Sequence, residues 1–163
     1  MWDILSETWP FWVFVLIAIA AFSLLRIWFR PQRLPYLARE KLVTNSELRF
    51  YKSLRKAVHG DWQIFAMVRI ADLLRVQEGV KNRRSWVNKI LAKHIDFVLC
   101  ESSTLKPVLC IELDDRSHQR KDRQERDEFV DEAFDSAGLP LLRVPVRSSY
   151  QSAEIRALID RML

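Results

Sequence analysis

The sequence predicts an α/β domain with a mixed β-sheet, preceded by one apolar helix at the N-terminus. In the polar part of the chain, stretches with helical periodicity alternate with short apolar runs, in the order helix, strand, helix, hairpin, helix, strand, helix. A further observation, an uncharged apolar run, sets the first 29 residues apart. The remaining residues, roughly 130, are enough for one domain with its own core.

The N-terminal apolar run extends from Thr8 to Leu25 without a charge and continues past Arg26 to Phe29. A helix needs about 20 such residues to cross a bilayer. Tryptophans stand near both ends of the run, as they do at membrane interfaces. We therefore expect a transmembrane anchor within residues 1–29, with residues 9–29 in contact with the membrane.

A cleaved signal peptide is the alternative for this segment, and Ala18-Ile19-Ala20 loosely resembles a cleavage site. A signal peptide begins with a basic region, whereas residues 1–8 carry two acidic residues and no basic one. The other flank is basic, with Arg26, Arg30, Arg33, Arg39 and Lys41. We therefore expect a retained single-pass anchor in the inner membrane and a cytoplasmic domain over residues 43–163. Residues 30–42 would form a basic linker suited to anionic lipids.

The domain is expected to begin with a helix over about residues 45–58. Thr44 and Glu47 have the spacing of a capping box, and apolar residues then recur at helical spacing. The other expected elements are a strand over residues 62–70, a helix over 85–92, strands over 95–100 and 108–113 joined by a turn near Thr104, a helix over 121–137 stopped by Gly138, a strand over 139–145, and a helix capped by Ser152 that runs to Leu163.

Composition narrows the classes of function. The formal net charge of +5 suits an anionic partner such as nucleic acid or a membrane surface, although a basic surface that only aids solubility explains it at least as well. Cys100 and Cys110 lie in apolar runs and are expected to be core residues, not zinc ligands or a disulfide framework. Three glycines leave no phosphate-cradling loop, and we expect no organic cofactor. We interpret Trp62 and Trp86 as packing residues, not as surfaces for base stacking.

The stretch IELDDRSH, residues 111–118, runs an apolar strand into three carboxylates and a histidine. If the two neighbouring strands form an antiparallel hairpin, three pairs face each other: Cys100 and Val108, Val98 and Cys110, Asp96 and Glu112. Asp114 falls on the same face as Glu112 because side chains alternate along a strand. Opposed like charges are destabilising. A divalent cation such as Mg²⁺ would offset this, and so would a raised pKa on one carboxylate or a neighbouring Arg or Lys.

Four sequence features together resemble the PD-(D/E)XK nuclease superfamily. They are Asp96, Glu112-x-Asp114-x-x-x-His118, the pair Arg126-Asp127, and the segment from Gly138 to Arg143-Val144. The chain looks most similar to the very-short-patch-repair-like branch and the related bacterial domain family DUF2726. In those relatives an Asp begins one core strand, an acidic-x-acidic or acidic-x-Lys motif closes the next, and a histidine follows. The resemblance covers about residues 43–145 and implies a restriction-endonuclease-like mixed sheet flanked by helices.

This resemblance implies metal-assisted hydrolysis of nucleic-acid phosphodiester bonds, with Mg²⁺ or Mn²⁺ as cofactor and DNA favoured over RNA. It implies that Asp96 and Glu112 bind the metal and that Glu47 lies near it. In our leading hypothesis Asp114, on the same face as Glu112, binds the metal as well. His118 would act as general base or orient the scissile phosphate. Arg116, Arg120, Lys121 and Arg123 follow and would grip the nucleic-acid backbone, although taken alone this run is better explained as a solvated helix cap.

One departure from the family pattern bears on activity. Asp114 stands where the lysine of the acidic-x-Lys form would be, so water activation would fall to His118, a nearby Lys or a second metal. The alternative function is therefore a catalytically inactive module of the same fold that binds nucleic acid or a protein partner at the membrane. A structural protein with a solvated or Arg-paired acidic cluster is a third possibility.

Overall fold

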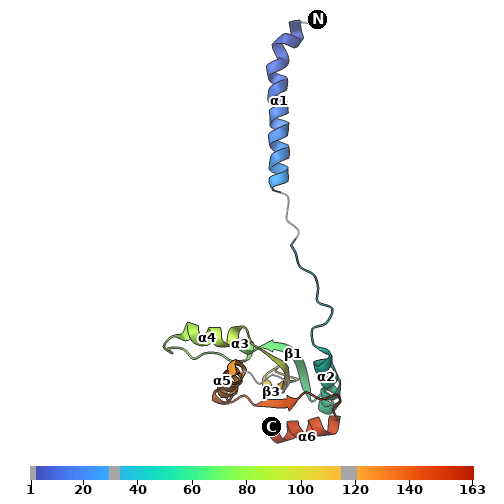
Figure 1. The fold of residues 1–163 in the computed structure, drawn as a ribbon, viewed down its shortest axis with the longest axis vertical. Coiled ribbons are helices and arrows are strands. Elements are labelled where there is room, and N and C mark those ends of the chain that lie inside the picture. Colours follow the sequence, from blue (N-terminus) through green and yellow to red (C-terminus); the bar gives the residue numbers. More distant parts are fainter. Residues whose placement is uncertain (1–2, 30–33, 115–120) are drawn as a thin grey trace. The chain divides into compact units, whose positions relative to one another are not determined.

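The computed structural model describes residues 3–29, 34–114 and 121–163, with the backbone alone for residues 3–8 and 121–126 (Figure 1). The chain divides into two compact units, Met1–Arg39 and Glu40–Leu163.

The first unit contains helix α1, Asp3–Trp28. Within it, the 20 residues Trp9–Trp28 are long and apolar enough to cross a membrane. Their large side chains are exposed, as Trp12 at 58% and Phe14 at 70% illustrate. An N-terminal signal sequence has the same length and composition.

The second unit is an α/β domain, as the sequence predicts. Its elements are α2 (Asn45–Val58), β1 (Trp62–Arg69), α3 (Ile70–Leu73), α4 (Arg83–Leu91), β2 (His94–Glu101), β3 (Pro107–Asp114), α5 (Lys121–Ala137), β4 (Leu141–Pro145) and α6 (Ser152–Met162). The four strands form one sheet in the order β1-β2-β3-β4. Strand β2 is antiparallel to both β1 and β3, and β4 pairs parallel to β3 after the crossover that contains α5. The sheet is therefore mixed.

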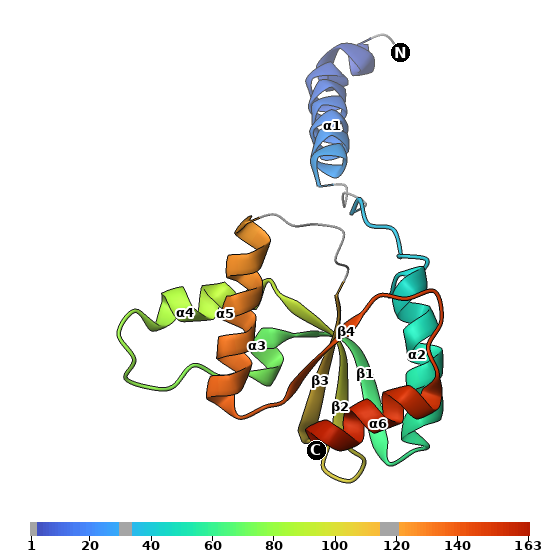
Figure 2. The same ribbon diagram turned by 60° about the horizontal axis from the view of Figure 1, so that its bottom comes forward.

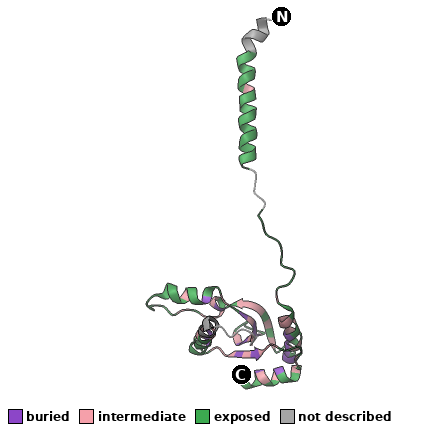
Figure 3. Ribbon diagram, in the orientation of Figure 1, coloured by how far each residue is buried: buried purple, intermediate pink, exposed green. Residues whose placement is uncertain are grey.

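Helices cover both faces of this sheet (Figure 2). Helices α2 and α6 pack on one face, where Phe50 and Ile159 meet Phe97 of β2 in one apolar cluster. On the other face α3, α4 and α5 contribute to a second cluster that includes Phe134 and Cys110. The buried residues gather in the sheet and on the helix surfaces turned toward it, as Figure 3 shows. Burial of these apolar side chains is the main force that holds the three layers together.

Local sequence signals explain the ends of α2. The N–H of Glu47 donates to Oγ1 of Thr44 at 3.3 Å, and the N–H of Thr44 donates to Oε2 of Glu47 at 2.9 Å. This reciprocal pair is the predicted capping box. The helix ends where His59 and Gly60 adopt positive φ angles of 44° and 85°.

The hairpin register agrees with the prediction at one pair and differs at another. Val98 lies opposite Cys110 as predicted, but Cys100 lies opposite Pro107 and not opposite Val108. A bulge between Leu99 and Cys100 shifts the register. It brings Glu101 opposite Lys106, whose carbonyl accepts the N–H of Glu101 at 2.9 Å in the tight turn that follows.

Two element boundaries also differ from expectation. The segment after β1 is the short helix α3, and Ile70 begins that helix instead of ending the strand. The prediction that Ser152 caps the last helix is wrong: Ser152 is the first helical residue, and Gln151 occupies the cap without a side-chain hydrogen bond.

The two cysteines are core residues, as predicted. Cys100 is 5% exposed and Cys110 fully buried, and both are free thiols. Burial raises the pKa of Cys110 to about 12, so this side chain stays protonated at neutral pH.

Candidate active site

The predicted acidic residues gather at one end of the sheet because of how its strands run. Strands β2 and β3 are antiparallel, so the first residues of β2 lie beside the last residues of β3. Asp96 is near the start of β2, and Glu112 and Asp114 close β3. Strand β4 is parallel to β3 and places Arg143 opposite Glu112.

Asp96 is half-buried and bonded to the neighbouring strand. Its Oδ2 accepts a hydrogen bond of 2.7 Å from the backbone N–H of Leu113. Burial raises the pKa of this carboxyl, the bond from Leu113 opposes the rise, and the negative charge of Glu47 adds to it. The negative charge of Glu47, in the first turn of α2, thus acts on the start of β2.

Glu112 faces a cation. Its Oε2 lies 3.3 Å from Nη1 of Arg143, and the two side chains are 26% and 25% exposed. The Nε of Arg143 donates to Oδ1 of Asp131 on α5 at 2.9 Å, and its Nη2 donates to the carbonyl of Asp127 at 3.4 Å. Burial acts to lower the pKa of Arg143, but the charges of Glu112 and Asp131 outweigh it and the pKa is raised. Arg143 thus links β3, β4 and α5.

Asp114 is half-buried at the end of β3, where its carbonyl accepts the N–H of Val146 at 2.9 Å. Arg116, His118 and Arg120 lie outside the described residues. Lys121 and Arg123 belong to the first turns of α5, for which the backbone alone is described. The roles of these five residues stay predictions.

The donor types at the site suit a hard cation, because Mg²⁺ takes carboxylate oxygens and needs only one or two of them beside water and phosphate. Within residues 3–29, 34–114 and 121–163, however, no group of three or more His, Cys, Asp or Glu side chains is arranged to hold a metal ion. Asp96 is bonded to Leu113 and Glu112 is paired with Arg143. Both alternatives that the sequence left open, a raised pKa and a neighbouring Arg, are thus present.

The contacts of Arg143 were not predicted from the sequence, although its position in the family-like motif was noted. Its partners come from α5 and β3, which are brought together only by the parallel crossover. Asp131 gives no separate signal, because it lies among several other acidic residues of a charged helix.

We predict that Asp96→Asn stabilises the domain at neutral pH. Because the folded-state pKa of Asp96 is raised, the folded state holds the proton to higher pH than the unfolded state does. The contribution of Asp96 to stability therefore falls as the pH rises through its unfolded pKa, about 3.9, toward the folded value. Asparagine keeps an oxygen for the N–H of Leu113 and removes the charge.

Urea unfolding at pH 7 and near pH 4 would measure this effect. Asp96→Asn should have a higher free energy of unfolding than wild type at pH 7. The difference should shrink near pH 4, where more of the wild-type carboxyl is protonated. Asp135→Asn, at an exposed position of α5, is the matched control. An Asp96→Asn variant that is less stable than wild type at pH 7 would contradict the prediction.

A family model described as "Protein of unknown function (DUF2726)" matches residues 39–162, a range that contains every element from α2 to α6. No curated protein and no solved structure matches the chain.

Proposed function

The chain belongs to the DUF2726 family, and we propose that its domain is a metal-dependent nuclease that hydrolyses nucleic-acid phosphodiester bonds. One observation carries the proposal. Asp96 and Glu112 stand on adjacent strands at one end of the sheet, and Glu47 is electrostatically coupled to Asp96. Burial raises the pKa of Asp96, and carboxylates with a perturbed pKa occur often at functional sites.

The order of the elements supports a restriction-endonuclease-like fold. Asp96 lies near the start of one strand, and Glu112-x-Asp114 closes the next. The charged helix α5 then leads through Gly138 to β4, which carries Arg143-Val144. This is the order of motifs that the resemblance to the PD-(D/E)XK superfamily implies.

Asp96, Glu112 and Asp114 would hold Mg²⁺ or Mn²⁺. When bound there, such an ion polarises a phosphoryl oxygen and lowers the pKa of a water molecule. Arg143 is anchored to Asp131 and presents its guanidinium beside Glu112, where it can bind an oxygen of the scissile phosphate. His118 would take a proton from the attacking water.

The N-terminal helix would keep this activity at the membrane. Its length and apolar composition support an anchor, and the basic residues of its C-terminal flank support a cytoplasmic domain. The accessible substrate would then be nucleic acid close to the inner face of the membrane.

A cleavage assay on the full chain in detergent tests the proposal. The chain would be incubated with plasmid and with single-stranded DNA, with Mg²⁺ or Mn²⁺ and in parallel with a chelator. We expect cleavage that requires the metal. If the chain shows no cleavage and its melting temperature does not change with metal, the proposed metal site is wrong.

The second candidate is an inactive module that binds nucleic acid or a protein partner at the membrane. Two observations favour it: Asp114 occupies the place of the lysine, and Arg143 already neutralises part of the charge on Glu112. A melting temperature that rises with Mg²⁺, without any cleavage, would support this candidate.

A further inference from the structure

The positive charge of the chain is concentrated in residues 75–93. This segment carries six Lys or Arg residues and one Glu, a net charge of +5, which equals the formal net charge of the whole chain. Four of its basic side chains are exposed on the loop before α4 and at the start of that helix: Arg75, Lys81, Arg83 and Arg84. Among the described residues none of these four has an ion-pair partner. Within the described residues, these four side chains are thus available to an anionic partner.

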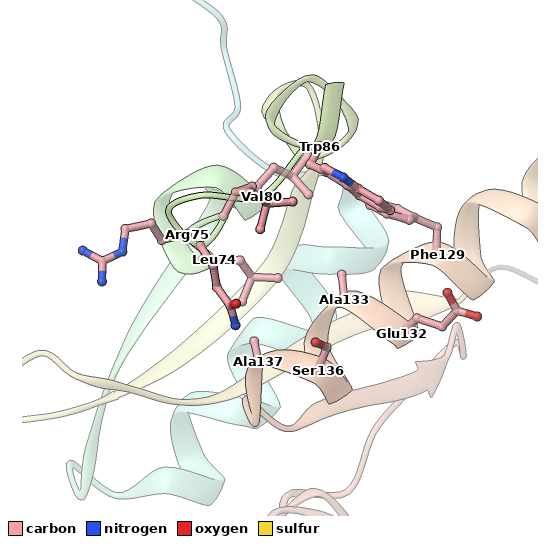
Figure 4. Close-up of a pocket in the computed structure, with 12 residues that line it drawn as sticks. Leu74, Arg75, Val80, Trp86, Phe129, Glu132, Ala133, Ser136 and Ala137 are labelled. Atoms are coloured by element: carbon pink, nitrogen blue, oxygen red, sulfur yellow. The ribbon is translucent and has the colours of Figure 1, made fainter. Parts of the chain in front are cut away.

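The same segment forms one wall of a groove of about 490 Å³. Leu74, Val80 and Trp86 face Ala133 and Ala137 of α5 across it (Figure 4). Gln77, Glu132 and Ser136 add hydrogen-bonding groups to the lining. A mostly apolar groove with a few polar groups is typical of a site for a flat organic ring.

Trp86 stands where the basic surface meets the groove, and it is 44% exposed. The Nζ of Lys89 lies 4.6 Å from the centre of the Trp86 ring and 5.0 Å from that of Phe129. This cation–π contact fixes the indole, while Lys89 is not part of the groove lining. Almost half of the surface of Trp86 therefore meets solvent and is accessible to a ligand.

We propose that this groove and its basic rim bind single-stranded nucleic acid, with a base stacked on Trp86 and the phosphates on Arg83, Arg84 and Lys81. Exposed aromatic rings beside positive charge bind single strands because every base has a flat face that can stack. A duplex keeps its bases inside and cannot place one in the groove. Neutralisation of phosphates by the basic rim supplies the remaining affinity.

Glu132 distinguishes this partner from an anionic lipid surface. Glu132 is one of the residues that line the groove, and its negative charge would repel a lipid phosphate nearby. The same carboxylate accepts hydrogen bonds from the amino group of a base, as Glu does with cytosine. The groove is thus suited to a base and the rim to its phosphates.

The location of the surface fits the candidate active site. Helix α4 is followed after two residues by β2, whose third residue is Asp96. The surface and the candidate active site are therefore carried by consecutive elements of the chain. The inference rests on the proposed function for its role in supplying substrate, but binding itself does not require hydrolysis.

Fluorescence anisotropy tests the proposal on the full chain in nanodiscs of neutral lipid, with a chelator present to prevent cleavage. The probes are a labelled single-stranded DNA, the RNA of the same sequence, and the corresponding DNA duplex. Trp86→Ala should weaken single-strand binding about tenfold and duplex binding much less. Trp86→Phe, which keeps a ring, should restore most of the affinity.

The basic rim is tested by the double variant Arg83→Gln/Arg84→Gln. In a plot of the logarithm of the association constant against the logarithm of the salt concentration, the slope should become less negative by about 1.4. The reason is that roughly 0.7 counterion is released for each phosphate of a single strand that a basic residue neutralises. Arg55→Gln/Lys56→Gln on α2 removes the same charge from another exposed position and should leave the slope near the wild-type value.

The proposal is wrong if Trp86→Ala leaves the affinity for the single strand unchanged. It is also wrong if the two double variants reduce the salt dependence of binding equally. Binding to vesicles of anionic lipid that depends on Arg83 and Arg84, with no binding of single strands, would assign the surface to the membrane instead. Because binding is measured without metal, it can succeed where cleavage fails, and the two proposals are tested separately.

Discussion

Replacing Glu112 by alanine is expected to reduce metal-dependent cleavage by at least about a thousandfold. Lewis-acid stabilisation of the transition state is worth several kcal/mol, and each 1.36 kcal/mol corresponds to a factor of about ten in rate. In the proposed site the Glu112 carboxylate would hold the metal ion that supplies this stabilisation, so its loss would remove the ion. Asp96→Ala should have an effect of the same size, because the two carboxylates stand on adjacent strands at the same site.

Glu101→Ala is the matched control for both variants. Glu101 is the last residue of β2, at the opposite end from Asp96, and its Oε2 accepts a hydrogen bond from Thr104 at 2.6 Å. Cleavage should be close to wild type in this variant. The fold of Glu112→Ala should persist, since Arg143 keeps its bond to Asp131. Full cleavage by a folded Glu112→Ala protein would show that any nuclease activity resides elsewhere.

Phe97→Ala is expected to lower the free energy of unfolding by about 3–5 kcal/mol, the range for large aromatic residues in a core. Phe97 is fully buried on β2. The centre of its ring lies 5.6 Å from that of Phe50 and 6.1 Å from that of Tyr51, both on α2. Its removal leaves a cavity between the helix and the sheet. Because Asp96 is the preceding residue, the same change should loosen the candidate site.

Urea unfolding of Phe97→Ala beside Phe65→Ala would measure this. Phe65 lies on the neighbouring strand β1 but is 41% exposed. Phe65→Ala should lower the free energy of unfolding much less, because less buried apolar surface is lost and water can fill the space that the ring leaves. Equal losses at the two positions would contradict the assignment of Phe97 to the core between α2 and the sheet.

The sequence predicted best where local chemistry decides the structure. The capping box of Thr44 and Glu47 fixes the start of α2, and positive φ at Gly138 follows the end of α5. Each of these features depends on residues a few positions apart. The pairing of Val98 with Cys110 was also predicted correctly, since alternation of apolar side chains sets the middle of a hairpin.

Features that depend on turn geometry or distant contacts were missed. The bulge at Cys100 accompanies a turn in which Leu105 has a φ of 58°, a conformation that leucine rarely adopts and that no residue pattern announces. The pairing of Glu112 with Arg143 joins residues that the crossover through α5 brings together. The exposure of Trp86 depends on how α4 lies against α5, which helical periodicity alone does not determine.

The rate at which the two buried thiols are modified can measure the stability of the domain. Cys100 and Cys110 lie on adjacent strands in the second apolar cluster, where an alkylating reagent cannot reach them. Modification therefore requires the sheet to open, since a reagent attacks the exposed thiolate. In the limit where closing is faster than labelling, the modification rate gives the free energy of opening in native buffer. The labelling rate of these two thiols thus measures the stability of the domain without denaturant.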